Sequence, residues 1–493
     1  MKSAVLCAVS CLVVIAPAAQ AVEATGRGEA IEHVKNIAYP NLHAEDEVNA
    51  GTDIEFAEMK VRGKRRTFAF AGSYGDGLQI VDITDPASSK RVSTWDCGVS
   101  QGDVQVFQRA DLRGRWFATY THDDGYDFHL DSKCATDLAA KGVDVTDVPP
   151  PPEPDGQLWT PESFYGAGTF IADVTNPYRP KTVSFVPVSR GSHNQTVHPS
   201  GRYLYNSNSD LMTSVNPAVE VYDITDIANP APIGEVDLKP LPGLGTESHD
   251  LVFSEDGTRA YVAALSHGEI LDTSDPANPV SIGTVVDPAI NVWHQMEDVT
   301  IEDPILGERR FLIAEDEVAG ASPTGQCPNG GVHVYDMTGE LEQAPVKVGA
   351  WNIDDVGLTE DGLGTCTAHV FQIHEEEKLM TIAYYNGGVR VVDLSGLVGL
   401  ALGENGVGMK QLGWYRFADG DTWAVKAPSV SRDGFYMYGN DHRRGFDVYR
   451  YAPETAEGAV SAGRWLSVGE SLAASRMLGT DAQVGGVCLL GAR

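Results

Sequence analysis

A short hydrophobic run that ends in the same kind of turn recurs seven times along the chain. Its copies end at Asp82, Asp173, Asp223, Asp272, Asp336, Asp393 and Arg450. Successive copies lie 91, 50, 49, 64, 57 and 57 residues apart, so the repeat is near fifty residues long and the wider intervals hold insertions. That period is typical of propeller blades and solenoid repeats. Because an aspartate can hydrogen-bond the turn backbone two residues later, the repeated aspartates are predicted to end strands rather than to perform chemistry.

Four strand-like segments make up one unit, most clearly in the fourth. That unit reads HDLVFS, RAYVAAL, EILDTSDP and PVSIGTVVD, with tight turns between the segments. Four antiparallel strands joined in this way are typical of one propeller blade.

The outermost segment follows only six of the seven markers. Its seventh copy, HVKNIAYP, lies near the N-terminus at residues 33–40. A ring of sheets must seal its ends to avoid exposed edges, so this strand is predicted to complete the blade whose other strands lie at 424–451. The predicted fold is therefore all-β, a seven-bladed β-propeller closed by an N-terminal strand, with blades from about residue 33 to residue 452.

Three segments are predicted to stand apart from the blades. Residues 1–21 combine Lys2, an apolar stretch and a small-residue end, which indicates a signal peptide cleaved before Val22. The propeller domain then spans 22–452, with a Pro-rich insertion at 126–166 in the second blade. A tail at 453–493 contains a short helix, indicated by Ser467 and Glu470 at capping-box spacing. With no later span long enough to cross a bilayer, the mature protein is expected to be secreted or extracytoplasmic and without a membrane span.

The charge of the chain limits its partners. Without Lys2 the mature chain has 35 basic and 69 acidic residues, a formal charge of −34. This field opposes nucleic acid and favours cations or basic partners, although it also serves solubility. The motifs of serine hydrolases, nucleotide-binding proteins and HExxH metalloproteases are absent from the sequence. We expect a monomer.

Five cysteines follow the predicted signal peptide: Cys97, Cys134, Cys327, Cys366 and Cys488. An export compartment permits disulfides. Pairs of Cys97 with Cys134 and of Cys327 with Cys366 would each join neighbouring loops of the predicted blades, although other pairings remain open. Cys366 precedes His369 by three residues, so a metal-ligand or nucleophile role is the alternative.

The repeated strands resemble the LVIVD-repeat family of secreted β-propeller proteins. The resemblance rests on residues 78–82 (LQIVD), 219–223 (VEVYD) and 389–393 (VRVVD), and it covers nearly the whole mature chain. The last copy departs from the pattern, with Arg450 where the family has Asp. The resemblance implies the fold and leaves the activity open, because the recurring residues are strand and turn positions.

The innermost strands of a propeller start at one mouth of its central channel. Alignment of the seven blades on these strands places the following residues in one register: Thr52, Gly102, His193, His249, Glu297, His369 and Lys426. His294 precedes Glu297 by three residues. Clustered imidazoles with a carboxylate match the ligand set of a divalent transition metal, here copper, iron or zinc. The alternative is that these histidines make structural hydrogen bonds or contact a ligand.

Loops on the same face contribute His122, His267 and His442, which with Lys426 are candidate ligand-binding residues. Their alternative role is in tight turns, where His tolerates left-handed backbone. Two acidic loops, HDDGYD and EDEVAG, could hold calcium but lack the full ligand spacing.

Three hypotheses follow. The first is a secreted scaffold that binds a small ligand or a protein at the His-rich, acidic channel mouth. The second is a metal-dependent oxidoreductase or hydrolase, whose plan is similar, in architecture alone, to four-histidine iron propeller oxygenases and to copper-dependent methanethiol oxidase relatives of selenium-binding proteins. The third is an inert surface component that assembles through its outer strands.

Overall fold

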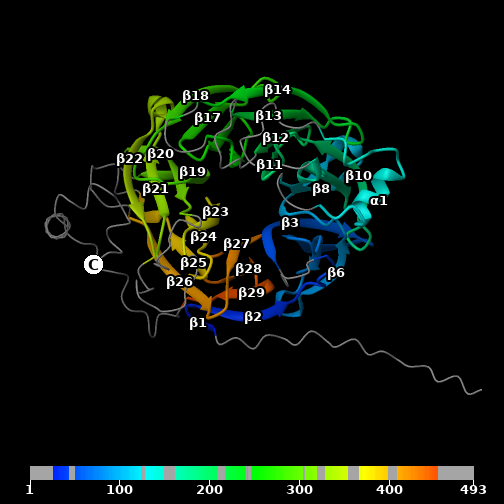
Figure 1. The fold of residues 1–493 in the computed structure, drawn as a ribbon. Coiled ribbons are helices and arrows are strands. Elements are labelled where there is room, and N and C mark those ends of the chain that lie inside the picture. The colour runs from blue at the N-terminus through cyan, green and yellow to red at the C-terminus, as the bar shows by residue number, and fades with distance from the viewer. Residues whose placement is uncertain are drawn as a thin grey trace, which may run out of the picture.

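The computed structural model describes residues 26–43, 50–123, 128–148, 161–207, 217–239, 241, 246–303, 306–318, 328–353, 366–397 and 408–453. Seven antiparallel sheets are arranged around a central axis (Figure 1). The first strands of the sheets contact one another in a closed cycle, from β3 through β7, β11, β15, β19, β23 and β27 back to β3. The predicted seven-bladed propeller is confirmed.

The blades follow chain order. Blade 1 contains β3 (Gly51–Val61), β4 (Lys64–Ser73), β5 (Leu78–Asp82) and β6 (Lys90–Trp95). Blade 2 contains β7 (Gln101–Arg109), β8 (Arg115–His122), β9 (Gly168–Asp173) and β10 (Lys181–Pro187). Blade 3 contains β11 (Asn194–Val197), β12 (Tyr203–Ser207), β13 (Ala218–Asp223) and β14 (Ala231–Asp237). Blade 4 contains β15 (Asp250–Phe253), β16 (Arg259–Ala263), β17 (Gly268–Asp272) and β18 (Val280–Val285).

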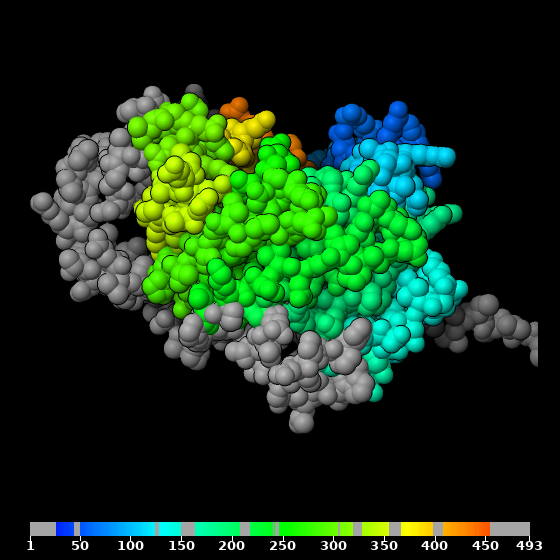
Figure 2. Space-filling model, turned by 90° about the horizontal axis from the view of Figure 1, so that it is seen from above, coloured from blue at the N-terminus to red at the C-terminus, as the bar shows by residue number. Residues whose placement is uncertain are grey.

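The remaining blades close the ring. Blade 5 contains β19 (Trp293–Asp303), β20 (Gly307–Asp316), β21 (Gly331–Asp336) and β22 (Val346–Trp351). Blade 6 contains β23 (His369–His374), β24 (Leu379–Ala383), β25 (Val389–Asp393) and β26 (Lys410–Phe417). Blade 7 contains β27 (Thr422–Lys426), β28 (Phe435–Asp441) and β29 (Gly445–Tyr451), completed by β2 (Ile31–Ile37). Seen from the side in Figure 2, the green residues of blades 3 and 4 lie against those of blade 5 without a gap.

Ring closure follows the predicted plan and adds one strand. β2 pairs antiparallel with β29, as predicted for the N-terminal segment. β1 (Gly26–Glu29) pairs with β26 and becomes a fifth strand of blade 6, which the sequence did not indicate because GRGE lacks an alternating apolar pattern. Ala30, at φ 57°, separates the two strands and carries the chain from blade 6 to blade 7.

The repeated aspartates end their strands as predicted. The Oδ1 atom of each accepts a hydrogen bond from the backbone N–H two residues later, in the pairs Asp82–Thr84, Asp173–Thr175, Asp223–Thr225, Asp272–Ser274, Asp336–Thr338 and Asp393–Ser395. These donor–acceptor distances are 2.7–3.1 Å. The turn therefore stops the third strand of each of the first six blades and sends the chain to the fourth.

The insertion in blade 2 contains the α-helix α1 (Lys133–Ala139). Cys134, Ala135 and Leu138 of α1 are buried in a hydrophobic cluster shared with blades 1 and 2. Cys97 and Cys134 form a disulfide with Cα atoms 5.0 Å apart, as predicted. Short 3-10 helices lie at Pro86–Ser88, Ala110–Leu112, Pro161–Phe164 and Gly339–Gln343.

Several predictions fall on residues that are not described. The signal peptide, residues 454–493 of the tail, Cys327 and Cys488 lie outside the described residues. Cys366 is itself disulfide-bonded, so its pairing with Cys327 stays a prediction while a role as a free thiol is not supported. Within the described residues, no helix has both the length and the apolar character needed to cross a membrane.

Candidate metal centre and channel cavity

Aromatic rings form a closed collar around one mouth of the channel. Ring centroids are 4.3 Å apart between His193 and His249, 4.5 Å between His249 and His294, and 4.2 Å between His294 and His369. The collar continues through Trp423, His442 and Tyr74 at centroid separations of 4.5, 4.6 and 5.5 Å. Gln101 closes it, since its side chain accepts from Tyr74 Oη at 2.7 Å and its Nε2 lies 2.9 Å from His193 Nε2.

Strand pairing fixes the imidazoles at this level. His193 and His249 directly precede β11 and β15, and their backbone N–H groups donate to the last residues of β12 and β16. His369 is the first residue of β23, and His294 lies within β19, next to an irregular register between Trp293 and Met296. His294 takes the place between His249 and His369.

One imidazole is oriented by a hydrogen bond on the nitrogen that faces away from the cluster. His369 Nδ1 donates to the carbonyl oxygen of Trp423 at 2.6 Å, which leaves an electron pair on its Nε2. His294 Nδ1 lies 2.6 Å from Glu315 Oε2, but neither atom has a hydrogen-bond partner within the described residues. Metal-binding histidines are commonly held in this way by a carbonyl or carboxylate behind them.

Glu317 faces both of these rings. Its Oε2 lies 3.7 Å from His294 Nε2 and its Oε1 lies 3.8 Å from His369 Nε2, distances too long for hydrogen bonds. Tyr385 Oη donates to Glu317 Oε1 at 2.7 Å and holds the carboxylate in place. The two imidazole nitrogens and the carboxylate oxygens therefore point into one common space. Ligands around a shared cation are arranged in this way.

The donor set fits a divalent transition metal. One ligand atom each from His249, His294 and Glu317 lies within 4.8 Å of the others, and all three residues are buried. Within the described residues, His249 Nδ1 and His369 Nε2 have no hydrogen-bond partner although both atoms are buried. Two imidazoles and a carboxylate, with a third imidazole adjacent, match zinc and non-haem iron sites.

Burial keeps the imidazoles neutral and the carboxyls protonated when no cation is present. Burial, with the neighbouring imidazoles, holds the pKa of His249 and His294 well below the usual value, and burial lowers the pKa of His369 to about 3. Burial raises the pKa of Glu317 to about 7 and that of Glu315 well above its usual value. A bound dication would stabilise both carboxylates in their charged form.

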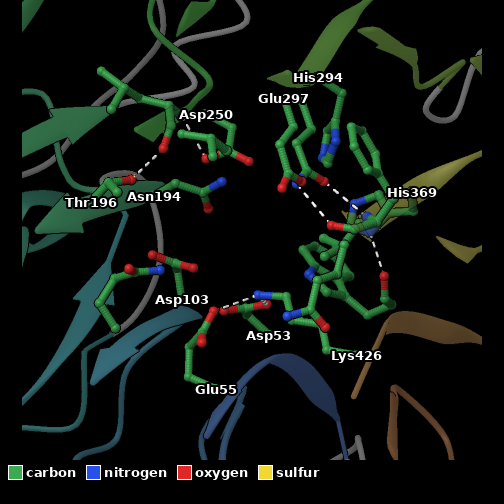
Figure 3. A pocket seen from close by; sticks show the side chains of 18 of the residues that line it. Asp53, Glu55, Asp103, Asn194, Thr196, Asp250, His294, Glu297, His369 and Lys426 are labelled. Atoms are coloured by element: carbon green, nitrogen blue, oxygen red, sulfur yellow. Dashed lines mark hydrogen bonds and ion pairs between the residues drawn. The ribbon is translucent and has the colours of Figure 1, made fainter. Parts of the chain in front are cut away.

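A cavity of about 190 Å³ opens beside the collar, one step further along the first strands (Figure 3). Five carboxyl groups line it and form what we call the acidic belt: Asp53, Glu55, Asp103, Asp250 and Glu297. Lys426 also lines the cavity, and its Nζ lies 2.8 Å from Asp53 Oδ1 and 2.7 Å from Glu55 Oε1. Although burial alone would lower the pKa of Lys426, these two carboxylates raise it, so the lysine stays charged.

The other belt carboxyls depend on burial and backbone bonds. Burial raises the pKa of Glu297 to about 8 and that of Asp250 to about 6. Glu297 accepts from the backbone N–H of Ile373 at 3.3 Å, and Asp103 accepts from that of Gln195 at 3.0 Å. With one lysine among five acidic groups, the cavity favours a cationic occupant.

The structure brings together four of the five predicted metal-site residues. His193, His249, His294 and His369 share the collar, whereas Glu297 lies in the belt. The sequence alignment had set Glu297 in the register of the histidines, and that register is wrong because the irregularity in β19 gives the place to His294.

The predicted ligand-binding residues separate into two groups. Lys426 lines the cavity and His442 belongs to the collar. His122 and His267 are completely buried and do not line the cavity. His122 Nδ1 accepts from the backbone N–H of Ser100 at 2.9 Å, and His267 Nδ1 lies 3.0 Å from Ser266 Oγ. These contacts are structural, but neither residue has the left-handed backbone that the sequence offered as the alternative role.

Sequence reasoning missed Glu315, Glu317 and Tyr385. The two glutamates belong to the EDEVAG segment, which the sequence suggested only as a weak calcium loop. Three consecutive acidic residues at the end of a buried strand are a signal, because alternate side chains there must point into the protein.

The family comparison agrees with this architecture. The family model described as LVIVD repeat matches residues 60–96, which cover β4, β5 and β6 of blade 1. The chain is a seven-bladed β-propeller that contains a match to the LVIVD repeat in blade 1. Its repeats build the strands and turns of the ring, whereas the collar and the belt lie outside the matched residues, apart from Tyr74.

Solved structures resemble this propeller only distantly. The periplasmic gluconolactonase of Pseudomonas aeruginosa matches at 13% identity and a TM-score of 0.47, over 76% of this chain and 92% of that one. A 6-phosphogluconolactonase candidate from Bacteroides fragilis matches at 13% identity and a TM-score of 0.37, over 74% and 94%. Similarity at this level indicates nothing about substrate. No curated protein is recognisably similar in sequence.

Proposed function

We propose that this propeller binds a divalent transition metal at the collar and a small cationic ligand in the cavity beside it. The observation that carries the proposal is the set of buried donors from His249, His294 and Glu317, which face one another without direct hydrogen bonds. Burying polar atoms without partners costs free energy, and a metal would offset that cost.

The neighbouring residues have supporting roles. The carbonyl of Trp423 orients His369, Glu315 lies beside His294, and Tyr385 positions Glu317. The metal would supply a Lewis acid at the channel mouth. The carboxyls of the acidic belt would hold the positive group of the ligand, and Lys426 forms ion pairs with Asp53 and Glu55.

Metal content of the mature protein, made without a histidine tag, tests this proposal. We expect the metal content to fall by one equivalent of copper, iron or zinc per chain in the double variant H249Q/H294Q. The matched control is H122Q/H267Q, which changes two buried imidazoles that do not line the cavity. Equal metal content in both variants would contradict the proposal.

A metal-dependent oxidoreductase or hydrolase is the second candidate. Glu297 favours it, because a buried carboxyl with a pKa of about 8 in the same cavity can hold a proton near neutral pH and release it to a reacting group. Oxygen uptake or ester hydrolysis by the metal-loaded protein, lost in E297Q while the metal is retained, would support this role. Activity that is the same in E297Q would contradict it.

We also propose that the protein is exported. The Cys97–Cys134 disulfide supports an oxidising compartment, and residues 1–21 have the pattern of a signal peptide. N-terminal sequencing of protein from the producing cell is expected to begin at Val22. A cytoplasmic protein whose N-terminal sequence still includes residue 2 would contradict export.

A further inference from the structure

A second group of metal-type donors lies outside the channel, between the ring closure and the insertion of blade 2. It contains His43, His129 and Asp131, whose ligand atoms lie within 4.8 Å of one another. His43 belongs to the segment between β2 and β3, and the other two precede α1. We propose that these three residues bind a divalent transition metal such as Zn²⁺ and thereby join the segment that closes the ring to the blade 2 insertion.

The imidazole of His43 is oriented as a ligand. Its Nε2 lies 2.7 Å from Asp96 Oδ1, so this nitrogen carries the proton and Nδ1 keeps its electron pair. His43 Nδ1 lies 3.8 Å from Asp131 Oδ1, beyond hydrogen-bond distance. A carboxylate behind one ring nitrogen and a carboxylate across from the other repeat the arrangement of Glu315, His294 and Glu317 in the collar.

The second imidazole is held against the first. The rings of His43 and His129 are stacked, with centroids 4.6 Å apart and an angle of 26° between their planes. Two protonated imidazoles would repel each other at this distance, whereas two neutral ones can share a cation. Two imidazoles and one carboxylate are a common set of protein ligands for zinc, with bonds of about 2.0–2.2 Å.

Backbone contacts and a disulfide preorganise the donors. The His129 N–H donates to the Gly98 carbonyl at 3.1 Å, and the Cys134 N–H donates to the Asp96 carbonyl at 3.0 Å. The Cys97–Cys134 bond fixes the same two segments to each other. His129 and Asp131 are therefore held beside Asp96, which contacts His43 Nε2, before any metal binds.

The site differs from the collar in exposure, which makes it testable without disturbing the core. The Asp131 side chain is 86% exposed and that of His43 is 13% exposed. Asp147, in the same insertion, is exposed and offers a matched control for Asp131. Replacing either aspartate with asparagine is not expected to affect folding.

Zinc binding measured by equilibrium dialysis against ZnCl₂, on tag-free protein in the H249Q/H294Q background, tests this site separately from the collar. We expect one Zn²⁺ per chain, bound about tenfold or more weakly in D131N and H43Q and unchanged in D147N. Absence of bound zinc in this background, or equal affinity in H43Q and D147N, would overturn the second site and leave the collar proposal standing.

A second measurement covers the case in which the background variant does not fold. In the otherwise wild-type protein, H43Q is expected to lower the zinc content by one equivalent and D147N to leave it unchanged. Co²⁺ alone serves as the spectroscopic probe, because its visible absorption is strong in a four-coordinate site. Unchanged zinc content and an unchanged Co²⁺ spectrum in H43Q would overturn the proposal.

Discussion

The collar and the acidic belt face the same cavity from neighbouring levels of the same strands, yet only the belt contains its own cation. In the belt, Lys426 neutralises Asp53 and Glu55 through direct ion pairs. In the collar, His249 Nδ1 and His369 Nε2 are buried without hydrogen-bond partners among the described residues. The same scaffold therefore pairs two carboxylates with a lysine at one level and leaves buried imidazole nitrogens unpaired at the other. The level with the unpaired nitrogens is where a metal would be bound.

The largest effect on metal binding is expected when one carboxylate at each level is replaced by an amide, in two separate variants. E317Q removes the charge that faces His294 and His369, so we expect metal affinity to fall about 100-fold or more, since even outer-shell changes cost about 10–100-fold. E297Q, in the belt, is expected to change it less than about threefold. Competition titration with a chelating dye measures both. A larger loss of metal affinity in E297Q than in E317Q would mean that Glu297, the carboxylate that the sequence favoured, belongs to the metal site.

Glu315 tests whether the collar depends on the support behind its imidazoles. E315Q weakens the contact with His294 Nδ1, and we expect affinity to fall by about tenfold. E269Q is the matched control, because Glu269 is also buried and lies 3.7 Å from an imidazole nitrogen, that of His267, away from the cavity. The same titration applies, and equal losses in both variants would mean that the effect is general destabilisation.

The pH dependence of metal binding shows whether protonation of an imidazole or of a carboxylate limits the metal affinity. The pKa of Glu317 is raised to about 7, so below that pH the metal must displace its proton, and above it the carboxylate is already free. Affinity should fall by up to about tenfold per pH unit below pH 7 and level off above it. The low pKa of His369 means that its imidazole adds nothing to this slope. Calorimetry in buffers of different ionisation enthalpy measures the released proton, and constant affinity from pH 5.5 to 7.5 would contradict the assignment.

The smallest effect on metal binding is expected at Lys426. K426M leaves Asp53 and Glu55 without their cation, so the free energy of unfolding should fall by about 1–3 kcal/mol while collar affinity changes less than threefold. Adding D53N should recover part of the lost stability, which denaturant unfolding can show. If K426M lowered metal affinity as much as E317Q does, the collar and the acidic belt would form one site.

Much of the architecture could be predicted from sequence because it depends on local rules. The turn aspartates, the strand pattern and the need to close the ring gave seven blades and the pairing of residues 33–40 with the last one. The strand β1 could not be predicted, since it has no apolar pattern. Its position depends on the close packing of Gly26 and Gly28 against Tyr415. Such a contact between blade edges leaves no periodic signal.

The candidate site was predicted in part for a related reason. Counting along the first strands identified His193, His249 and His369, because strand starts share one level in a propeller. Counting failed at β19, where an irregular register puts His294 rather than Glu297 at that level. Glu315, Glu317 and Tyr385 come from the ends of second strands in blades 5 and 6, and only the three-dimensional packing brings them to the imidazoles.

Anomalous diffraction at the zinc absorption edge, from crystals grown with ZnCl₂, tests the central claim most directly. The proposed centre predicts a peak within about 2.0–2.2 Å of nitrogen atoms of His249 and His294 and of an oxygen of Glu317. A map with no peak among these three residues, and water hydrogen-bonded to His249 Nδ1 and His369 Nε2 instead, would contradict it.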